Sequence, residues 1–173
     1  MKNEFVMPIL VLTLICVVVS GALAFMDGIT HPVIEAAAID RAQAAMNAII
    51  PEATGFEQIG TDGLPPTVRE AYKTENNVGY IFILSVNGFS GEIRVICGID
   101  PEGEIISCGA LSHTETKGIG TILDQPSFTG QFDGKDSRLE GISTVTGATI
   151  STRAYIGAIR DAFAAYEAVQ GVR

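Results

Sequence analysis

Hydrophobic residues are distributed very unevenly along this chain of 173 residues. No charged residue occurs from Phe5 to Met26, and Ile, Leu and Val dominate Ile9 to Val19. As a helix, this run is long enough to cross the ~30 Å hydrocarbon layer of a membrane. The pattern predicts that residues 1–26 form a short cytoplasmic start and a transmembrane anchor in the lipid bilayer.

A cleaved secretory signal peptide is the alternative interpretation of this run, because Ala22-Leu23-Ala24 resembles a cleavage site. However, the run is longer than the apolar region of an ordinary signal peptide, and it is preceded only by Lys2, offset by Glu4. We therefore favour an uncleaved anchor.

The positions of the first cations predict an orientation in the cell (inner or cytoplasmic) membrane. Lys2 precedes the span, whereas the first cation after it is Arg41, which favours a cytoplasmic amino terminus and an extracytoplasmic domain. Because Lys2 and Glu4 cancel, the exported part carries the whole net charge of −9. An acidic chain without a basic cluster argues against binding to nucleic acid.

Residues 27–50 have a helical pattern of small and apolar residues and are expected to form a linker helix. Pro32 suits the first turn of such a helix, and Pro51 would stop it.

The exported domain is expected over residues 51–173. Its predicted sheet begins where the spacing of apolar residues changes to that of a strand. Strands are predicted over Gly79–Val86, Glu92–Ile99 and Glu104–Leu111, separated by turn signals at Asn87-Gly88 and Asp100–Gly103. The three segments predict an antiparallel meander.

Helices are expected on either side of this meander. A short helix is predicted around Thr67 to Lys73, and a longer one from about Thr152 to Val169, where apolar residues recur every three or four positions. Strands in the middle and helices at the ends indicate an α+β fold.

The predicted pairing also concerns two cysteines. If Ile99 pairs with Glu104, Cys97 and Cys108 are diagonal neighbours, which is marginal for a disulfide. Two buried thiols and a thiol redox site both remain open, and the sequence lacks the spacing of a zinc or iron–sulfur site.

The junction before the last helix, Thr146 to Thr152, is rich in small and hydroxylated residues. Ser151 or Thr152 can cap the helix. The same hydroxyls, with free helix amides, can alternatively form a phosphate site.

Thr146-Gly147-Ala148-Thr149 resembles the [S/T]GAT motif of the FMN-binding domain family. The resemblance implies that a flavin transferase esterifies the phosphate of FMN onto Thr149. The family usually has Asp three positions before the motif, where this chain has Ser143.

A second segment, His113 to Gly120, is similar to the HxETPGxG loop of that family. The resemblance implies that Glu115, Thr116, Lys117 and Gly118 lie around the flavin. Lys117 replaces the usual Pro, and we hypothesise that its charge stabilises reduced, anionic flavin and raises the potential. Proton transfer by His113 is not expected.

The resemblance extends from about Val78 to Val169. With one span before one small domain, it implies an electron-transfer subunit of a membrane ion-translocating ferredoxin:NAD oxidoreductase complex. Its partners would be the other membrane and peripheral subunits. The alternatives are the corresponding subunit of a sodium-pumping NADH:quinone reductase and a flavin-free, membrane-anchored binding module.

Overall fold

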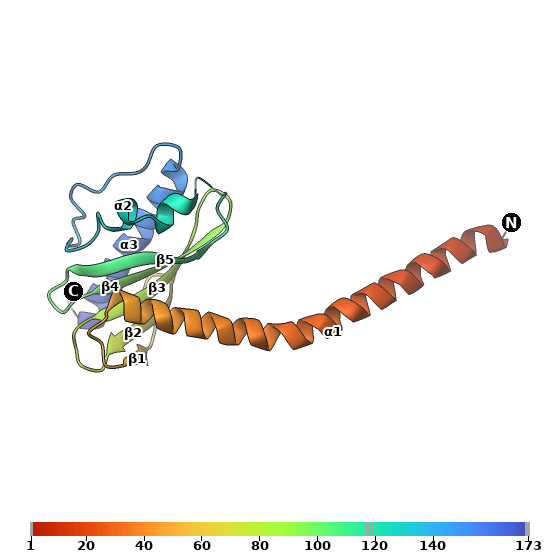
Figure 1. Ribbon diagram of the computed structural model, residues 1–173, viewed down its shortest axis with the longest axis horizontal. Helices are drawn as coiled ribbons and strands as arrows, with labels where there is room; N and C mark the ends of the chain where they lie inside the picture. The colour runs from red at the N-terminus through yellow and green to blue at the C-terminus, as the bar shows by residue number, and fades with distance from the viewer. Residues whose placement is uncertain (1, 117, 119, 172–173) are drawn as a thin grey trace. The chain divides into compact units, whose positions relative to one another are not determined.

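The computed structural model describes residues 2–116, 118 and 120–171, excluding the side chains of residues 2–6 and 32–40. It has one sheet of five antiparallel strands in sequence order, with helices at both ends of the chain (Figure 1). The elements are α1 (Lys2–Ile49), β1 (Phe56–Ile59), β2 (Val68–Thr74), β3 (Tyr80–Asn87), β4 (Glu92–Ile99), β5 (Ile105–His113), η1 (Gly120–Asp124), α2 (Pro126–Thr129) and α3 (Thr149–Gln170).

The first helix, α1, continues through Pro32 and ends just before Pro51, so no separate linker helix begins at Pro32. Inside a helix, proline removes one backbone hydrogen bond and can bend the helix without ending it. The segment Met7–His31 is long and apolar enough to span a membrane, at roughly 37 Å for 1.5 Å per residue. From Ala42 onward, α1 belongs to the same compact unit as the sheet.

The predicted α+β fold with a meander and a carboxyl-terminal helix is confirmed, but the meander has two more strands than expected. The helix predicted around Thr67 to Lys73 is wrong, because this segment is strand β2. Its buried residues Val68, Ala71 and Thr74 are spaced by three, as in a helix. The spacing between Val68 and Ala71 arises from a bulge, since Val68 pairs with Leu84 and Glu70 with the adjacent Ile83. Thr74 ends the strand, where its hydroxyl is hydrogen-bonded to the backbone of Gly79.

The predicted β4–β5 register is also wrong. Ile99 lies opposite Ile105 rather than Glu104. The register then shifts by one residue between Ile99 and Gly98, which lies opposite Ser107. Consequently Cys97 lies directly opposite Cys108.

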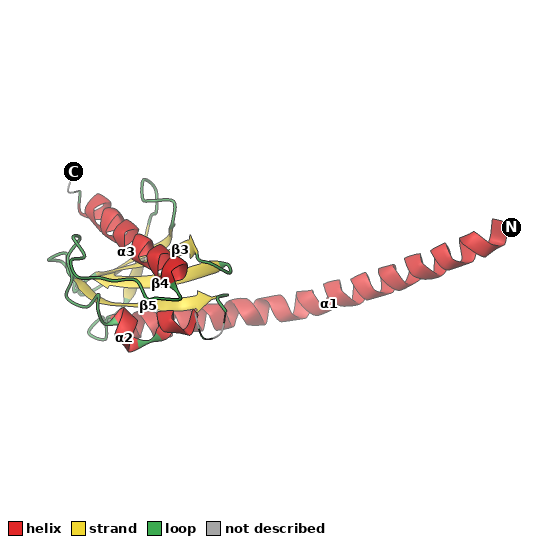
Figure 2. Ribbon diagram, turned by 90° about the horizontal axis from the view of Figure 1, so that it is seen from above, coloured by secondary structure: helices red, strands yellow, loops and turns green. Residues whose placement is uncertain are grey.

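The helix α3 lies across one face of the sheet (Figures 1 and 2). The main core forms between them and includes Phe82, Cys97, Tyr155 and Ile159. A second cluster covers the other face, where Met46, Ile49 and Ile50 pack against Ile81, Ile83 and Ile96. Both faces of the central strands are therefore buried.

Candidate functional site

The candidate site begins at the turn that leads into α3. Gly147 has a φ of +88°, a conformation that favours glycine, and the amide of Ala148 donates to the carbonyl of Val145 at 3.0 Å. This turn places Thr149 in the first position of α3.

The helix starts earlier than predicted, so Ser151 and Thr152 are not its caps. Both are buried inside the first turn, and no side chain caps α3 in the described chain. The Thr152 hydroxyl donates to the Ala148 carbonyl at 2.9 Å and accepts from the Val145 amide at 3.3 Å. Thr152 thus fixes the turn from within, which allows the helix to begin at Thr149.

Thr149 is exposed, unlike Ser151 and Thr152. Its hydroxyl makes a long hydrogen bond, 3.5 Å, to the Val145 carbonyl. The position is therefore accessible to a modifying enzyme and lies at the positive end of the helix dipole.

A pocket of about 280 Å³ opens beside Thr149. Two large apolar side chains contribute to it, Phe89 from the β3–β4 turn and Ile150 from α3, which are 68% and 56% exposed. Sequence reasoning missed Phe89, although an aromatic residue directly after an Asn-Gly turn was the available signal. The lining consists of Phe89, Gly147, Ala148, Thr149, Ile150 and Ser151.

Glu115 joins the β3–β4 turn to the start of α3. Its carboxylate accepts hydrogen bonds from the Ser90 amide at 3.1 Å and from the Ser151 hydroxyl at 2.8 Å. Glu115 is only 8% exposed and has no ion-pair partner among the residues that the structure describes. The carboxylate is therefore held by hydrogen bonds that connect its own loop with the β3–β4 turn and with the first turn of α3.

Two glycines make room for Glu115. A methyl group at Gly88 would collide with the carboxylate, and one at Gly120 would collide with the Cβ of Glu115. The small residues of both segments thus permit the close approach that Glu115 needs.

The other predicted residues of this loop lie beside Glu115 rather than in the pocket lining. The hydroxyl of Thr116 is 3.2 Å from that of Ser90, and Gly118 is exposed with a φ of +93°. Lys117 lies outside the described residues. Of the TGAT residues, Gly147, Ala148 and Thr149 line the pocket, whereas Thr146 is exposed next to it.

His113, at the end of β5, is paired with Asp124 of η1 through Nε2 at 3.0 Å. Its Nδ1 is buried and has no hydrogen-bond partner in the described chain. The pair connects the two ends of the loop that carries Glu115.

The two facing thiols are poorly suited to redox chemistry. Both cysteines are buried and free. Burial raises the pKa of Cys97 well above its usual range and that of Cys108 to about 12. Because the thiolate is the reactive form, a thiol redox function is disfavoured.

The residues around the pocket fit an FMN group. The hydroxyl of Thr149 can carry an ester, free amides at the start of α3 favour a phosphate, and Phe89 and Ile150 offer apolar surface to a planar ring. The volume is slightly below the ~300–1,000 Å³ of pockets that enclose a small molecule, so a flavin would remain partly exposed.

Comparison with known proteins agrees with this chemistry. Residues 88–164 match the family model described as FMN-binding domain, a range that contains both sequence motifs and the α3 start. The match agrees with the resemblance seen in the sequence.

Three relatives align with this chain over most of its length. The G subunit of the ion-translocating oxidoreductase complex of Methanosarcina acetivorans is 27% identical over 98% of both chains. The G subunit of the proton-translocating ferredoxin:NAD(+) oxidoreductase complex of Clostridium ljungdahlii is 26% identical over 87% of this chain and 85% of its own. The Na(+)-translocating counterpart of Acetobacterium woodii is 25% identical, over 91% and 89% respectively.

Proposed function

We propose that this chain is an electron-transfer subunit that carries FMN, ester-linked to Thr149, in a membrane ion-translocating ferredoxin:NAD oxidoreductase complex of the Rnf type. The observation that carries the proposal is the exposed Thr149 hydroxyl in a TGAT turn, beside a partly apolar pocket in an FMN-binding domain. On this proposal the chain is a redox subunit and not a stand-alone enzyme.

An ester to Thr149 has a physical advantage outside the cytoplasm. A dissociated nucleotide would be diluted, whereas a tether keeps its effective concentration high. Bound FMN supplies the electron-accepting and electron-donating chemistry, while the protein sets its position and environment. Glu115 holds Ser90 and Ser151 in place, and we propose that Thr116, Lys117 and Gly118 complete the surroundings of the flavin.

Maturation would require a flavin transferase that recognises the turn before α3. Thr146, Thr149 and the intervening Gly147 are exposed, so the motif is accessible on the folded domain. Ser143, in place of the usual Asp, is also exposed.

The relatives support other subunits of the same complex as partners, because all three are named as subunits of ion-translocating oxidoreductase complexes. The corresponding subunit of a sodium-pumping NADH:quinone reductase remains the second candidate within the same family. Co-purification of ferredoxin:NAD oxidoreductase subunits with this chain distinguishes the two.

We further propose that Met7–His31 spans the bilayer with the amino terminus in the cytoplasm. This segment contains one acidic residue and no Lys or Arg, and its side chains are exposed in the described chain. Lys2, on its amino-terminal side, supports the orientation.

Flavin fluorescence on a denaturing gel tests the central proposal. The full chain, produced together with a flavin transferase, should retain fluorescence after denaturation, and Thr149→Ala should lose it. Ser137→Ala, an exposed hydroxyl outside the motif, is the matched control, and its fluorescent peptide should still contain Thr149. Fluorescence that survives Thr149→Ala would refute the attachment site, and a wild-type chain without fluorescence would favour the flavin-free binding module.

A further inference from the structure

A second cleft lies alongside α3, between this helix and the loop that precedes it. It has a volume of about 450 Å³ and contains two arginines from α3, Arg153 and Arg160. Two hydroxyl residues and three apolar residues complete it, and none of the described residues that line it is acidic: Leu139, Ile142, Ser143, Thr144 and Ile156.

The two arginines are not neutralised by the chain itself. Both side chains are exposed, and neither has an ion-pair partner in the part of the chain that the structure describes. By contrast, Arg94 is paired with Glu70 at 3.1 Å and Arg138 with Asp136 at 2.6 Å. In a chain with net charge −9, two uncompensated cations in one cleft form a local positive site.

The helix dipole does not account for these positions. Acidic residues stabilise the first turn of a helix and basic residues the last. The first turn of α3 has no acidic residue and its last turn no basic one, whereas Arg153 lies near the start and Glu167 near the end. Interaction with the helix dipole therefore does not explain why Arg153 and Glu167 stand at these positions.

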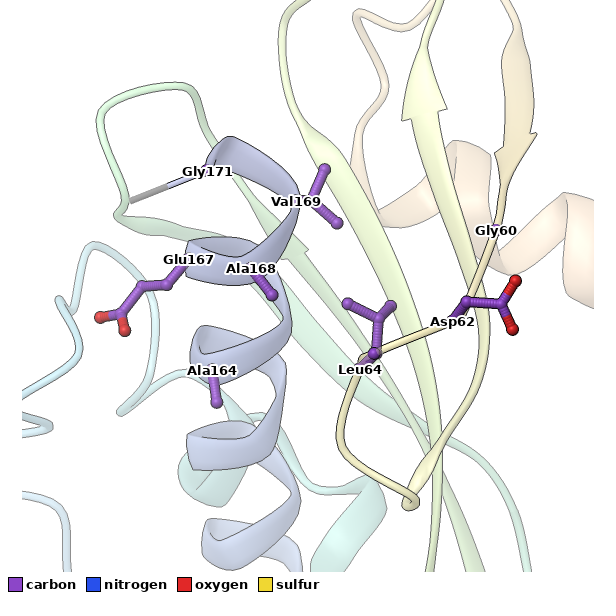
Figure 3. Close-up of a pocket in the computed structure, with 9 residues that line it drawn as sticks. Gly60, Asp62, Leu64, Ala164, Glu167, Ala168, Val169 and Gly171 are labelled. Atoms are coloured by element: carbon purple, nitrogen blue, oxygen red, sulfur yellow. The ribbon is translucent and has the colours of Figure 1, made fainter. Parts of the chain in front are cut away.

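The other end of α3 differs in charge. Another cleft, shown in Figure 3, is formed with the β1–β2 loop and contains Asp62 and Glu167. The two carboxylates point away from each other in the figure, so they do not converge on a cation. On α3 the positive cleft thus runs from Arg153 to Arg160 and does not reach the acidic cleft at the end of the helix.

Arg153 and Arg160 also share a helical face with the proposed attachment residue. Thr149, Arg153, Ile156 and Arg160 are separated by four, three and four positions, which aligns them along one side of α3. A protein bound in the cleft would therefore lie next to Thr149.

From these observations we propose that the cleft between Leu139 and Arg160 is the docking site for an acidic segment of a neighbouring subunit that exchanges electrons with the flavin. The proposal rests on the proposed function. Carboxylates would pair with Arg153 and Arg160, while apolar side chains of the same segment would cover Ile142, the half-buried apolar residue of the cleft.

Charge and composition favour such a protein segment as the occupant. Arginine is enriched among the residues that dominate the binding energy of protein interfaces, and in this cleft it lies beside the half-buried Ile142. The net negative charge elsewhere would repel an acidic partner, so attraction at this cleft would also select its orientation.

Zero-length cross-linking in the purified complex tests the proposal. Arg153→Lys and Arg160→Lys retain the positive charge and introduce an amine that a carbodiimide couples to a carboxylate, forming an amide with loss of water. Peptide mapping should find an amide from R153K or R160K to an Asp or Glu of another subunit. Arg69→Lys, an exposed position on β2, is the control and should give no such product.

The outcomes are distinguishable. Cross-links only to carboxylates of this chain, equal products from R69K, or no product would overturn the docking site. A phosphate or nucleotide seen by native mass spectrometry and lost in an R153Q/R160Q variant would also overturn it, because the cleft would then hold a small anion. Flavin fluorescence and co-purification are measured on the same samples, and their loss in the wild-type complex would instead refute the proposed function.

Discussion

Glu115 is the residue on which the geometry of the candidate site depends most directly. Its carboxylate holds the β3–β4 turn, through the Ser90 amide, and α3, through the Ser151 hydroxyl. The position of Phe89 beside Thr149 follows from these two hydrogen bonds, since Phe89 precedes Ser90 and Thr149 lies two residues before Ser151.

Replacement of Glu115 by Ala should destabilise the folded domain by about 1–3 kcal/mol, because it leaves buried polar groups without partners. It should also loosen the pocket and increase the rotational freedom of an attached flavin. Thermal unfolding and flavin fluorescence anisotropy of the full chain in detergent measure the two effects. Glu140→Ala, at an exposed position, is the control; if both variants behave alike, Glu115 does not organise the site.

At the scale of single residues, the sequence indicated two candidate motifs but not the contacts around them. Thr149 and the loop around Glu115 became candidates because short motifs lie in consecutive residues. The pairing of Glu115 with Ser151 joins positions 36 residues apart, and Phe89 reaches the pocket from a third segment. Such contacts depend on the strand register, which periodicity alone does not define.

Among the secondary-structure elements, the strands show the same limit. The apolar pattern predicted β3 and β4 nearly to their ends, but bulges changed the periodicity of β2 and the register of β5. A bulge inserts one residue, so it gives a strand an apparent spacing of three and shifts every later pair.

The end of α1 packs on the sheet through a position that requires glycine. A Cβ added at Gly98 would lie 2.5 Å from the Cγ2 of Ile49 and 3.3 Å from the Cγ1 of Ile50. We expect Gly98→Val to overpack this contact and lower stability by about 1–3 kcal/mol. At Gly109, a Cβ would lie 3.9 Å from Ile96, an ordinary contact, so Gly109→Ala is the control. Equal unfolding midpoints for both variants would show that α1 does not pack closely here.

The facing thiols of β4 and β5 should make the free energy of unfolding vary with pH in the alkaline range. Burial raises the pKa of both thiols in the folded chain, that of Cys108 to about 12. In the unfolded chain both thiols lose their protons above about pH 9, whereas in the folded chain Cys108 keeps its proton until about pH 12. The free energy of unfolding should therefore fall as pH rises, by up to ~1.4 kcal/mol per pH unit for each thiol.

Unfolding measured from pH 8 to 10.5 tests this dependence. A Cys97→Ala/Cys108→Ala variant should have a lower stability at pH 8 and a weaker decrease with pH than the wild type. Parallel pH profiles would mean that the thiols titrate normally in the folded protein.

For the whole molecule, the central question is on which side of the membrane the flavin lies. The proposed span Met7–His31 lies in the sequence between the amino terminus and the compact unit that begins at Ala42, so the proposal puts these two parts on opposite sides. The native thiols give little background for a labelling experiment, because Cys97 and Cys108 are buried and Cys16 lies within the proposed span. Cysteines introduced on either side can therefore report the topology.

A membrane-impermeant maleimide applied to intact cells whose outer layers admit it should label Ser137→Cys, at an exposed position before α3, but not Asn3→Cys. After permeabilisation, both variants should react. The reverse pattern would place the domain in the cytoplasm, where a tether is not needed to prevent dilution of FMN. The intact mass of the same samples determines whether the first 26 residues are retained, as the proposed anchor requires.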